Sequence, residues 1–282
     1  MFQCNTRVAI LMATFNGEKY IEEQIRSITN QSYTNWTLYI RDDGSTDQTI
    51  NIVQSLAKDD NRIVICPNTT KYKSPLKNFM NLLEDVDAEL YMFSDQDDYW
   101  LGNKVLLSVE AYDNVPNHDN IPCVVHTNVS LVDTDLKMKV ESRWQAINLN
   151  PNKLKKYEFI AQCCYTQGAT MLFNQKAKQV SFPVASYAHM HDWWVATRCI
   201  KNNGTIISVN TPTMLYRQHS ANVLGVSYSR NILGRMGWKS LRKVLKDNFE
   251  IYQTLKQDGY GLWLKFLYYK IYLMIHMSIK NK

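Results

Sequence analysis

Strand-like and helix-like segments alternate along the first hundred or so residues, and this alternation limits the possible folds more than any other feature. Short, continuous apolar runs that indicate buried strands occupy 7–14, 36–40, 62–66 and 91–94. Apolar residues at helical spacing occupy 20–28, 50–56 and 76–86. Strands joined by helices predict right-handed crossovers and a mostly parallel sheet flanked by helices. We therefore expect a Rossmann-like α/β fold.

Polar clusters follow three of the predicted strands directly. They are Thr14-Phe15-Asn16-Gly17, Asp42-Asp43-Gly44-Ser45 and Asp95-Gln96-Asp97-Asp98. In open α/β sheets, ligands bind beyond the carboxyl ends of the strands. Three unrelated solvated loops would not need to share this position, so we expect the clusters to converge on one crevice.

The third cluster places three carboxylates within four positions, at Asp95, Asp97 and Asp98. Such groups repel one another, and a hard divalent cation that bridges substrate phosphates is a common use of them. Taken alone, the cluster would favour a solvated acidic loop over a cation site. The first strand is not followed by Gly-x-Gly-x-x-Gly, and the chain has no Gly-Lys-Ser/Thr loop, so neither a dinucleotide fold nor a phosphate-loop nucleotidase is indicated.

Five motifs carry a resemblance to a known family. The segments 13–17, 41–47 and 94–100 resemble the three signatures of the inverting family-two glycosyltransferases, which have a GT-A fold. The segments 191–194 and 216–223 resemble the rhamnosyltransferase-like subgroup of bacterial polysaccharide synthesis. The similarity extends from about 7 to 225. It implies a GT-A domain at 1–228, with a nucleotide-sugar half at about 1–120 and an acceptor half at about 121–228.

The resemblance also implies roles for residues of the nucleotide-sugar half. Those expected to hold the nucleotide are Thr14, Asn16, Glu18, Asp42 and Asp43. Asp42 would accept a hydrogen bond from the imide of a pyrimidine ring, which favours UDP or dTDP over purine nucleotides.

A divalent cation and the donor sugar are expected at the third cluster. Asp97 would bind Mg²⁺ or Mn²⁺ carrying the diphosphate oxygens, because all-oxygen ligation suits these ions. Asp95 and Gln96 would lie beside the donor sugar. Arg217 and His219 would reach the diphosphate, although without the motif they are equally compatible with an ordinary surface pair.

Inversion requires a base that removes the acceptor proton from the side opposite the leaving group, and Asp192 is the candidate. Trp193 and Trp194 would form an apolar wall on the acceptor side, where Gly168 also lies by resemblance. Two alternatives remain. Asp192 could cap a helix beginning at Trp193, or it could join His189 and His191 in a transition-metal half-site.

The segment His126-Thr127-Asn128 ends another apolar run. It either faces the sugar or is an ordinary polar strand end whose hydrogen bonds are satisfied.

The chain has 282 residues and a net charge of +6, and its basic excess lies entirely near the C-terminus. Residues 231–282 hold ten Lys and Arg against three Asp and Glu. The segment 232–249 indicates a basic amphipathic helix, and 260–279 an aromatic-rich helix interrupted by charges, so neither predicts a membrane span. We expect the extension at 229–282 to lie on a membrane surface or to pack on the domain or another subunit. Its many large apolar residues argue against nucleic-acid binding.

The six cysteines include no Cys-x-x-Cys pair, and no secretory peptide is evident, so reduced thiols in the cytoplasm are expected. The predicted protein is a peripheral enzyme on the inner face of the cell membrane. It would transfer rhamnose from dTDP-rhamnose to a hydroxyl of a lipid-linked oligosaccharide in cell-surface polysaccharide synthesis. Alternatives are a UDP-hexose or UDP-HexNAc transferase, a nucleotidyltransferase, or a non-catalytic sugar-nucleotide-binding assembly protein. The oligomeric state is left open.

Overall fold

The computed structural model describes residues 6–68, 70–163, 165–219 and 238–278. Within these residues one sheet contains nine strands. Its order is β3 (Ile63–Ile65), β2 (Trp36–Asp42), β1 (Val8–Thr14), β4 (Leu90–Ser94), β8 (Met171–Asn174), β6 (Cys123–Val132), β9 (Thr205–Arg217) and β5 (Tyr99–Trp100), with β7 (Met138–Val140) paired to β6.

The sheet is parallel where the sequence alternation predicts it. Strands β3, β2, β1 and β4 are all parallel, and β6 and β9 form a second parallel pair. Strand β8 is antiparallel to both β4 and β6 and so joins the two parallel parts, while β5 runs antiparallel to β9. The α/β expectation is confirmed, and parallel pairing is densest in the first hundred residues.

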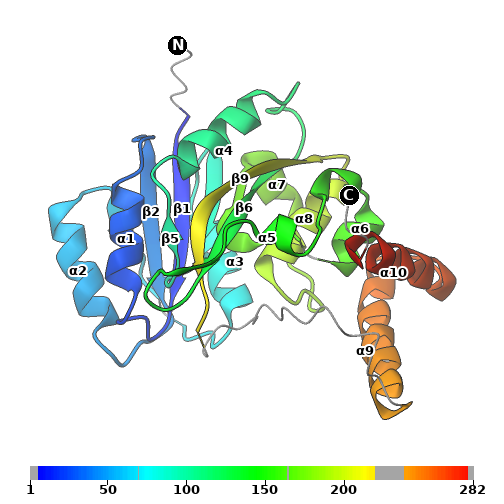
Figure 1. The fold of residues 1–282 in the computed structure, drawn as a ribbon. Coiled ribbons are helices and arrows are strands. Elements are labelled where there is room, and N and C mark those ends of the chain that lie inside the picture. The colour runs from blue at the N-terminus through cyan, green and yellow to red at the C-terminus, as the bar shows by residue number, and fades with distance from the viewer. Residues whose placement is uncertain (1–5, 69, 164, 220–237, 279–282) are drawn as a thin grey trace.

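Helices cover both faces of the sheet (Figure 1). One face carries α1 (Ile21–Thr29), α2 (Thr49–Asp59) and α4 (Lys104–Asp113). The other carries α3 (Pro75–Asp85), α6 (Tyr157–Gln162), α7 (Gln175–Val180) and α8 (His191–Lys201). Successive strand side chains point to opposite faces, so Ile10 joins one buried core and Leu11 the other. The result is a three-layer structure whose strands β1, β2 and β4 end at one edge.

Local sequence explains where the smaller elements begin. Helix α3 starts after Ser74, whose hydroxyl accepts a hydrogen bond from the backbone N–H of Lys77, with Pro75 in the first turn. Gly168–Thr170 forms the short 3₁₀ helix η2 directly before β8. Between β7 and α6 lie the short α5 (Arg143–Ala146) and the 3₁₀ helix η1 (Pro151–Lys153).

Two helices, α9 (Trp238–Gln257) and α10 (Trp263–Ser278), form a C-terminal hairpin. The chain turns from one helix into the other at Gly259 and Gly261, whose φ values of +74° and +98° favour glycine. Tyr252 and Phe266 are buried in the same core as α6 and α8, so the predicted packing on the domain is confirmed for the inner face. The predicted helix at 232–249 and the domain boundary at 228 fall partly or wholly outside the described residues. In the described part of the chain, no helix combines the length and apolar character needed to cross a bilayer.

Candidate active site

The three polar clusters predicted at strand ends are joined by hydrogen bonds. The Thr14 hydroxyl donates to Asp42 Oδ1 at 3.0 Å and links the first loop to the second. The backbone N–H of Phe15 donates to Gln96 Oε1 at 2.9 Å, and Gln96 Nε2 donates to the Phe15 carbonyl at 3.0 Å. The first loop is thus bonded to both other loops, and all three lie at one edge of the sheet.

The Asp42 carboxylate organises the second loop. Besides Thr14, it accepts the backbone N–H of Gly44 at 2.8 Å and that of Ser45 at 2.7 Å, and it also accepts the Ser45 hydroxyl. Four donors occupy about all the lone-pair positions of a carboxylate. A nucleotide that hydrogen-bonds Asp42 would therefore have to replace one of these donors.

The other predicted nucleotide residues hold loops together. Asn16 Oδ1 accepts the N–H of Thr46 at 2.9 Å, and Glu18 accepts that of Gln48 at 2.9 Å. Asp43 accepts two backbone N–H groups, those of residues 72 and 73, both at 2.6 Å. Their present bonds are structural, and direct nucleotide contact by these three residues stays a prediction.

The third cluster meets the end of β9. Asp97 Oδ2 lies 2.9 Å from His219 Nε2, and Arg217 Nε donates to the Asp97 carbonyl at 2.8 Å. The Arg217 guanidinium also pairs with Glu23, bonds the Thr134 carbonyl and lies over the Tyr20 ring. The structure therefore brings Arg217 and His219 to Asp97. However, the Arg217 side chain is buried and already engaged, so its contact with a diphosphate stays a prediction.

Burial, together with the crowding of carboxylates, determines the electrostatics of the site. Burial, followed by the nearby carboxylates of Asp97 and Asp192, raises the pKa of Asp95 to about 7. Burial also raises the pKa of Asp98, and it lowers the pKa of the neighbouring Lys104 to about 7. The Asp192 carboxylate, from the acceptor half, therefore acts electrostatically on Asp95.

Asp192 lies in the first turn of α8, where the helix dipole favours a negative charge. The helix begins at His191, so the prediction that Asp192 caps a helix starting at Trp193 is wrong by position. Asp192 Oδ2 accepts the N–H of Gly168 at 3.0 Å, and Oδ1 accepts that of Trp193 at 2.7 Å. These two bonds orient a carboxylate that is 8% exposed.

A residue without a Cβ is needed at position 168, because His191 and Asp192 pack closely against it. A Cβ at Gly168 would lie 2.6 Å from His191 Nε2 and 3.4 Å from the Asp192 Cβ. His191 is buried, stacks on Phe79 with ring centroids 4.1 Å apart, and has no hydrogen-bond partner on either ring nitrogen among the described residues. No group of three or more His, Cys, Asp or Glu able to hold a metal occurs in the described segments, so the His189–His191 half-site gains no support.

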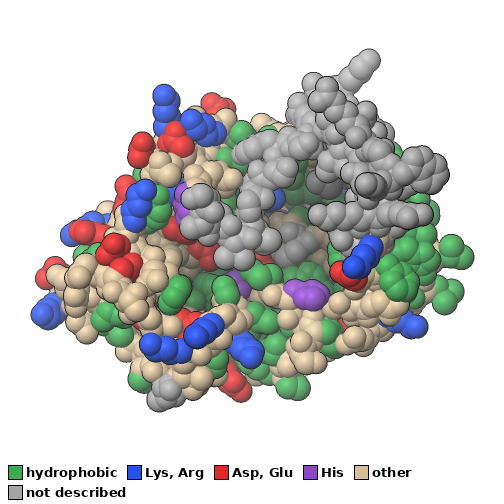
Figure 2. Space-filling model, turned by 90° about the horizontal axis from the view of Figure 1, so that it is seen from below, with side chains coloured by type: hydrophobic (Ala, Val, Ile, Leu, Met, Phe, Trp, Pro, Cys, Tyr) green, Lys and Arg blue, Asp and Glu red, His purple; other side chains and the backbone are tan. Residues whose placement is uncertain are grey.

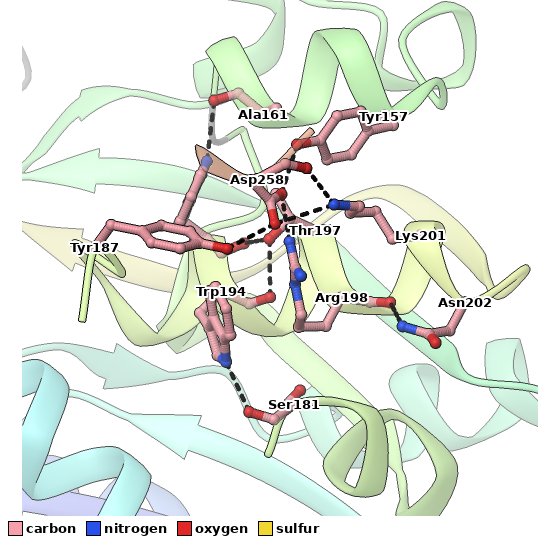
Figure 3. A network of polar contacts seen from close by, with 11 residues as sticks. Tyr157, Ala161, Ser181, Tyr187, Trp194, Thr197, Arg198, Lys201, Asn202 and Asp258 are labelled. Atoms are coloured by element: carbon pink, nitrogen blue, oxygen red, sulfur yellow. Dashed lines mark hydrogen bonds and ion pairs between the residues drawn. The ribbon is translucent and has the colours of Figure 1, made fainter. Parts of the chain in front are cut away.

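Trp193 and Trp194 are core side chains. Their indole N–H groups donate to the carbonyls of Ala161 at 3.0 Å and Ser181 at 2.7 Å. Figure 3 shows the Trp194 indole directed toward Ser181. This placement favours a packing role beneath Asp192, and contact with an acceptor stays a prediction.

The polar run on β6 makes hydrogen bonds inside the protein, although His126 Nδ1 has no partner among the described residues. His126 Nε2 lies 2.7 Å from Ser208 Oγ, the hydroxyls of Thr127 and Thr213 are 2.6 Å apart, and Asn128 Nδ2 donates to Ser142 Oγ at 2.7 Å. Of the two readings of His126-Thr127-Asn128, hydrogen bonding within the fold is the one observed.

Phe15 is a residue at this edge of the sheet to which the sequence predictions gave no role. Its side chain is 55% exposed beside the Thr14–Asp42 contact, while Gln96 holds its backbone on both sides. An apolar residue at the end of a buried strand normally belongs to the core. The only feature of the sequence that indicated a different place for Phe15 was its position inside the first motif, 13–17. Figure 2 views this edge from below and shows acidic and histidine side chains beside a hollow.

The fold is one that glycosyltransferases use. The crystal structure of Staphylococcus aureus TarS 1–349 matches this chain with a TM-score of 0.58 at 18% identity. The match covers 75% of this chain and 60% of that chain, and the same protein has also been solved with UDP-GlcNAc. The mannosyltransferase PcManGT of Pyrobaculum calidifontis, solved with GDP-Man and Mn²⁺, matches with a TM-score of 0.56 at 16% identity, covering 77% of this chain and 58% of that one.

Sequence comparison gives the family. The model for glycosyl transferase family 2 matches residues 9–178, and the chain belongs to this family. The dTDP-rhamnosyl transferase RfbG of Shigella flexneri is 29% identical over 88% of this chain and 86% of its own length. The Escherichia coli enzyme WfgD, a UDP-Glc:alpha-D-GlcNAc-diphosphoundecaprenol beta-1,3-glucosyltransferase, is 24% identical over 70% of each chain.

Proposed function

We propose that this family 2 glycosyltransferase inverts configuration as it transfers a sugar from a pyrimidine nucleotide to a hydroxyl of a lipid-linked glycan. Its place would be cell-surface polysaccharide synthesis. The observation that carries the proposal is the meeting of the Asp42 loop, the Asp95–Asp97 carboxylates and Asp192 at one edge of the sheet. Ligands of open α/β sheets bind at this edge.

Rhamnose from dTDP-rhamnose is the favoured donor, because RfbG covers most of this chain and is a dTDP-rhamnosyl transferase. A UDP-hexose or UDP-HexNAc is the second candidate, supported by the names of WfgD and of the TarS complex. The sugar pocket depends on side-chain positions that differ between relatives of one fold.

On the nucleotide side, Thr14 and Asp42 would face the base and ribose. The exposed Phe15 ring would stack on the base, because its backbone is fixed while its side chain is open. Since Asp43 and Asn16 hold the surrounding loops, they would act by shaping this pocket.

A divalent cation fits the donor set. Burial and then the neighbouring carboxylates disfavour the charged form of Asp95, a cation at this cluster would relieve that cost, and oxygen ligands suit Mg²⁺ or Mn²⁺. Asp97 would hold the ion, and the substrate diphosphate would supply oxygens that the protein lacks. When bound, such an ion stabilises negative charge on the departing nucleotide. Asp95 would lie beside the donor sugar.

Asp192 would act as the base. Its carboxylate is fixed by the N–H groups of Gly168 and Trp193, and it would accept the proton of the acceptor hydroxyl as that oxygen attacks the anomeric carbon. The buried indoles of Trp193 and Trp194 hold the first turn of α8 in place. They would thereby keep Asp192 aimed at the acceptor.

The C-terminal hairpin supports a location on the inner face of the cell membrane. On α10 the apolar residues Leu264, Tyr268, Ile271 and Ile275 are exposed at helical spacing, while Phe266 and Leu273 on the opposite face are buried. A helix with two apolar faces requires a partner that buries the second face from water as well. The basic excess of residues 231–282 would favour anionic lipid as the partner of this exposed face.

The test of the donor site is calorimetric titration of the full chain with dTDP-rhamnose, UDP-glucose, UDP-GlcNAc and GDP-mannose, with Mn²⁺ and again with chelator. Metal-dependent binding of the dTDP- or UDP-sugar is expected. If folded protein bound none of the four, the donor assignment would be abandoned. Release of diphosphate from a nucleoside triphosphate and a sugar phosphate would instead identify a nucleotidyltransferase.

A further inference from the structure

A polar groove lies away from the carboxylate cluster, between strand β9 on one side and α5 with the segment that follows it on the other. Its volume is about 470 Å³, within the range of small-molecule sites. Ser208 and Asn210 of β9 form one wall. Ser208 pairs with His126 of β6 and Arg217 pairs with Val132, so six residues of β6, or roughly 20 Å at about 3.3 Å per residue, separate this wall from the donor-site end of β9.

The lining of this groove has a distinctive chemistry. Five of its nine lining residues carry amide side chains, one carries a hydroxyl, and none carries an ionisable group. An amide offers donors and an acceptor together, as a sugar hydroxyl does, so the two are matched partners. The absence of cationic groups from the lining disfavours phosphates and nucleotides. The apolar part of the lining includes Trp144, Leu149 and Pro151, which are buried and therefore fixed.

The wall on β9 is built by buried polar residues of β6. His126 Nε2 holds the Ser208 hydroxyl at 2.7 Å, and burial lowers the pKa of His126 to about 3, so this contact is made by a neutral ring. A bulge displaces Asn210, since Thr127 pairs with Val209 but Asn128 pairs with Pro212. Asn128 Nδ2 then holds the Asn210 carbonyl at 3.1 Å and leaves its side chain exposed.

We infer that this groove binds uncharged sugar residues of a glycan, at a site separate from the donor cleft. The buried polar run His126-Thr127-Asn128, which the transfer reaction does not use, would serve to hold the wall of this site in shape. The inference rests on the proposed function only in taking that glycan to be part of the acceptor.

The test is binding of the full chain to an array of neutral oligosaccharides built from hexoses, 6-deoxyhexoses and N-acetylhexosamines, with acidic glycans alongside. The wild type is expected to retain members of the neutral set, with saturating UDP present or absent. A double variant, Asn152→Ala with Asn210→Ala, should weaken this binding at least tenfold, because both amides are exposed in the lining. Asn51→Ala, which removes an exposed amide from α2, is the matched control and should change nothing.

Three results would overturn the inference: retention of no neutral glycan, equal retention by the double variant, or displacement of the glycan by UDP. The bulky Asn152→Trp provides a second check, since it should block the groove without removing any hydrogen bond of the core. Donor binding by the same variants, measured with dTDP-rhamnose and UDP-glucose, separates this question from the proposed function. The groove variants should bind donor as the wild type does.

Discussion

At the scale of single residues, the sequence predicted which side chains meet but not what each one does. Asp42, Asp97 and Asp192 were singled out from strand ends and motifs, and the structure brings them to one edge. Burial could not be foreseen. Trp193 follows a polar motif, yet it lies in the core, and Arg217 is enclosed by partners from three distant segments.

Gly168→Ala tests whether Asp192 must be held in one position. The new Cβ would lie 2.6 Å from His191 Nε2, so the first turn of α8 has to shift. We expect kcat to fall about 100-fold, as misplacement of a catalytic group by about 1 Å can cause. Donor affinity should stay unchanged. Gly102→Ala is the control, because its Cβ would meet nothing closer than 3.7 Å. Equal kcat for both variants would contradict the role given to Gly168.

Phe15→Ala tests the stacking surface for the base. The ring is exposed, so its loss should leave stability nearly unchanged and weaken nucleotide binding about tenfold, since aromatic stacking on a base contributes roughly 1–3 kcal/mol. Calorimetry with UDP measures this effect. Phe249→Ala, at another exposed phenylalanine, should bind UDP like the wild type. If the two variants had the same affinity, Phe15 would have no place in the nucleotide site.

At the scale of elements, a buried carboxylate fastens the C-terminal hairpin to α8. Asp258, in the turn between α9 and α10, accepts the hydroxyls of Tyr157 and Tyr187 and pairs with Arg198 and Lys201 (Figure 3). Helix positions were predictable from apolar spacing. The contacts of Asp258 were not predictable, because its partners lie 57 to 101 residues from it in the chain and no local sequence pattern relates them to it.

Asp258→Asn should destabilise the protein in a pH-dependent way. Burial raises the pKa of Asp258, but hydrogen bonds from Arg198, Tyr157, Lys201 and Tyr187 outweigh it and leave the pKa below its ordinary value. The stabilisation is therefore present above the unfolded-state pKa of about 3.9 and is lost as pH falls through the lower folded-state pKa. Chemical denaturation at pH 7 should give a loss of about 3 kcal/mol.

The matched control for Asp258 is Glu22→Gln, which removes one partner of the exposed pair with Arg26 and should cost less than about 0.5 kcal/mol. At about pH 3 the difference between wild type and Asp258→Asn should shrink. A difference that stayed constant from pH 7 to pH 3 would show that the charge of Asp258 is not what holds the hairpin.

At the scale of the whole molecule, the catalytic edge and the hairpin are distinct surfaces of one body. Figure 2 shows apolar side chains gathered at the right, on the side where Figure 1 places α9 and α10, and the hollow nearer the centre. The sequence predicted an apolar, basic extension but left open whether it packs or binds membrane. Packing settles only the inner face, because the burial of one face of a helix does not determine what covers the other.

Vesicle binding tests the outer face of α10. The full chain should cosediment with vesicles of POPC and POPG and much less with POPC alone, since basic residues favour anionic lipid. Leu264→Ser combined with Ile271→Ser should reduce binding at least fivefold, while Met138→Ser, at an exposed apolar position on β7, should not. If the wild type ignored both vesicles but was dimeric by light scattering, and the double variant was monomeric, a second copy would be the cover.

The most direct test of the central claim compares Asp192→Asn with the wild type in two assays. One measures affinity for dTDP-rhamnose and UDP-glucose with Mn²⁺, and the other measures transfer of the labelled sugar to a lipid extract containing polyprenyl-linked glycans. Asparagine keeps the shape of the side chain but cannot accept the proton, so donor affinity should match the wild type while transfer falls at least 100-fold. Transfer at the wild-type rate by Asp192→Asn would contradict the assignment of the base.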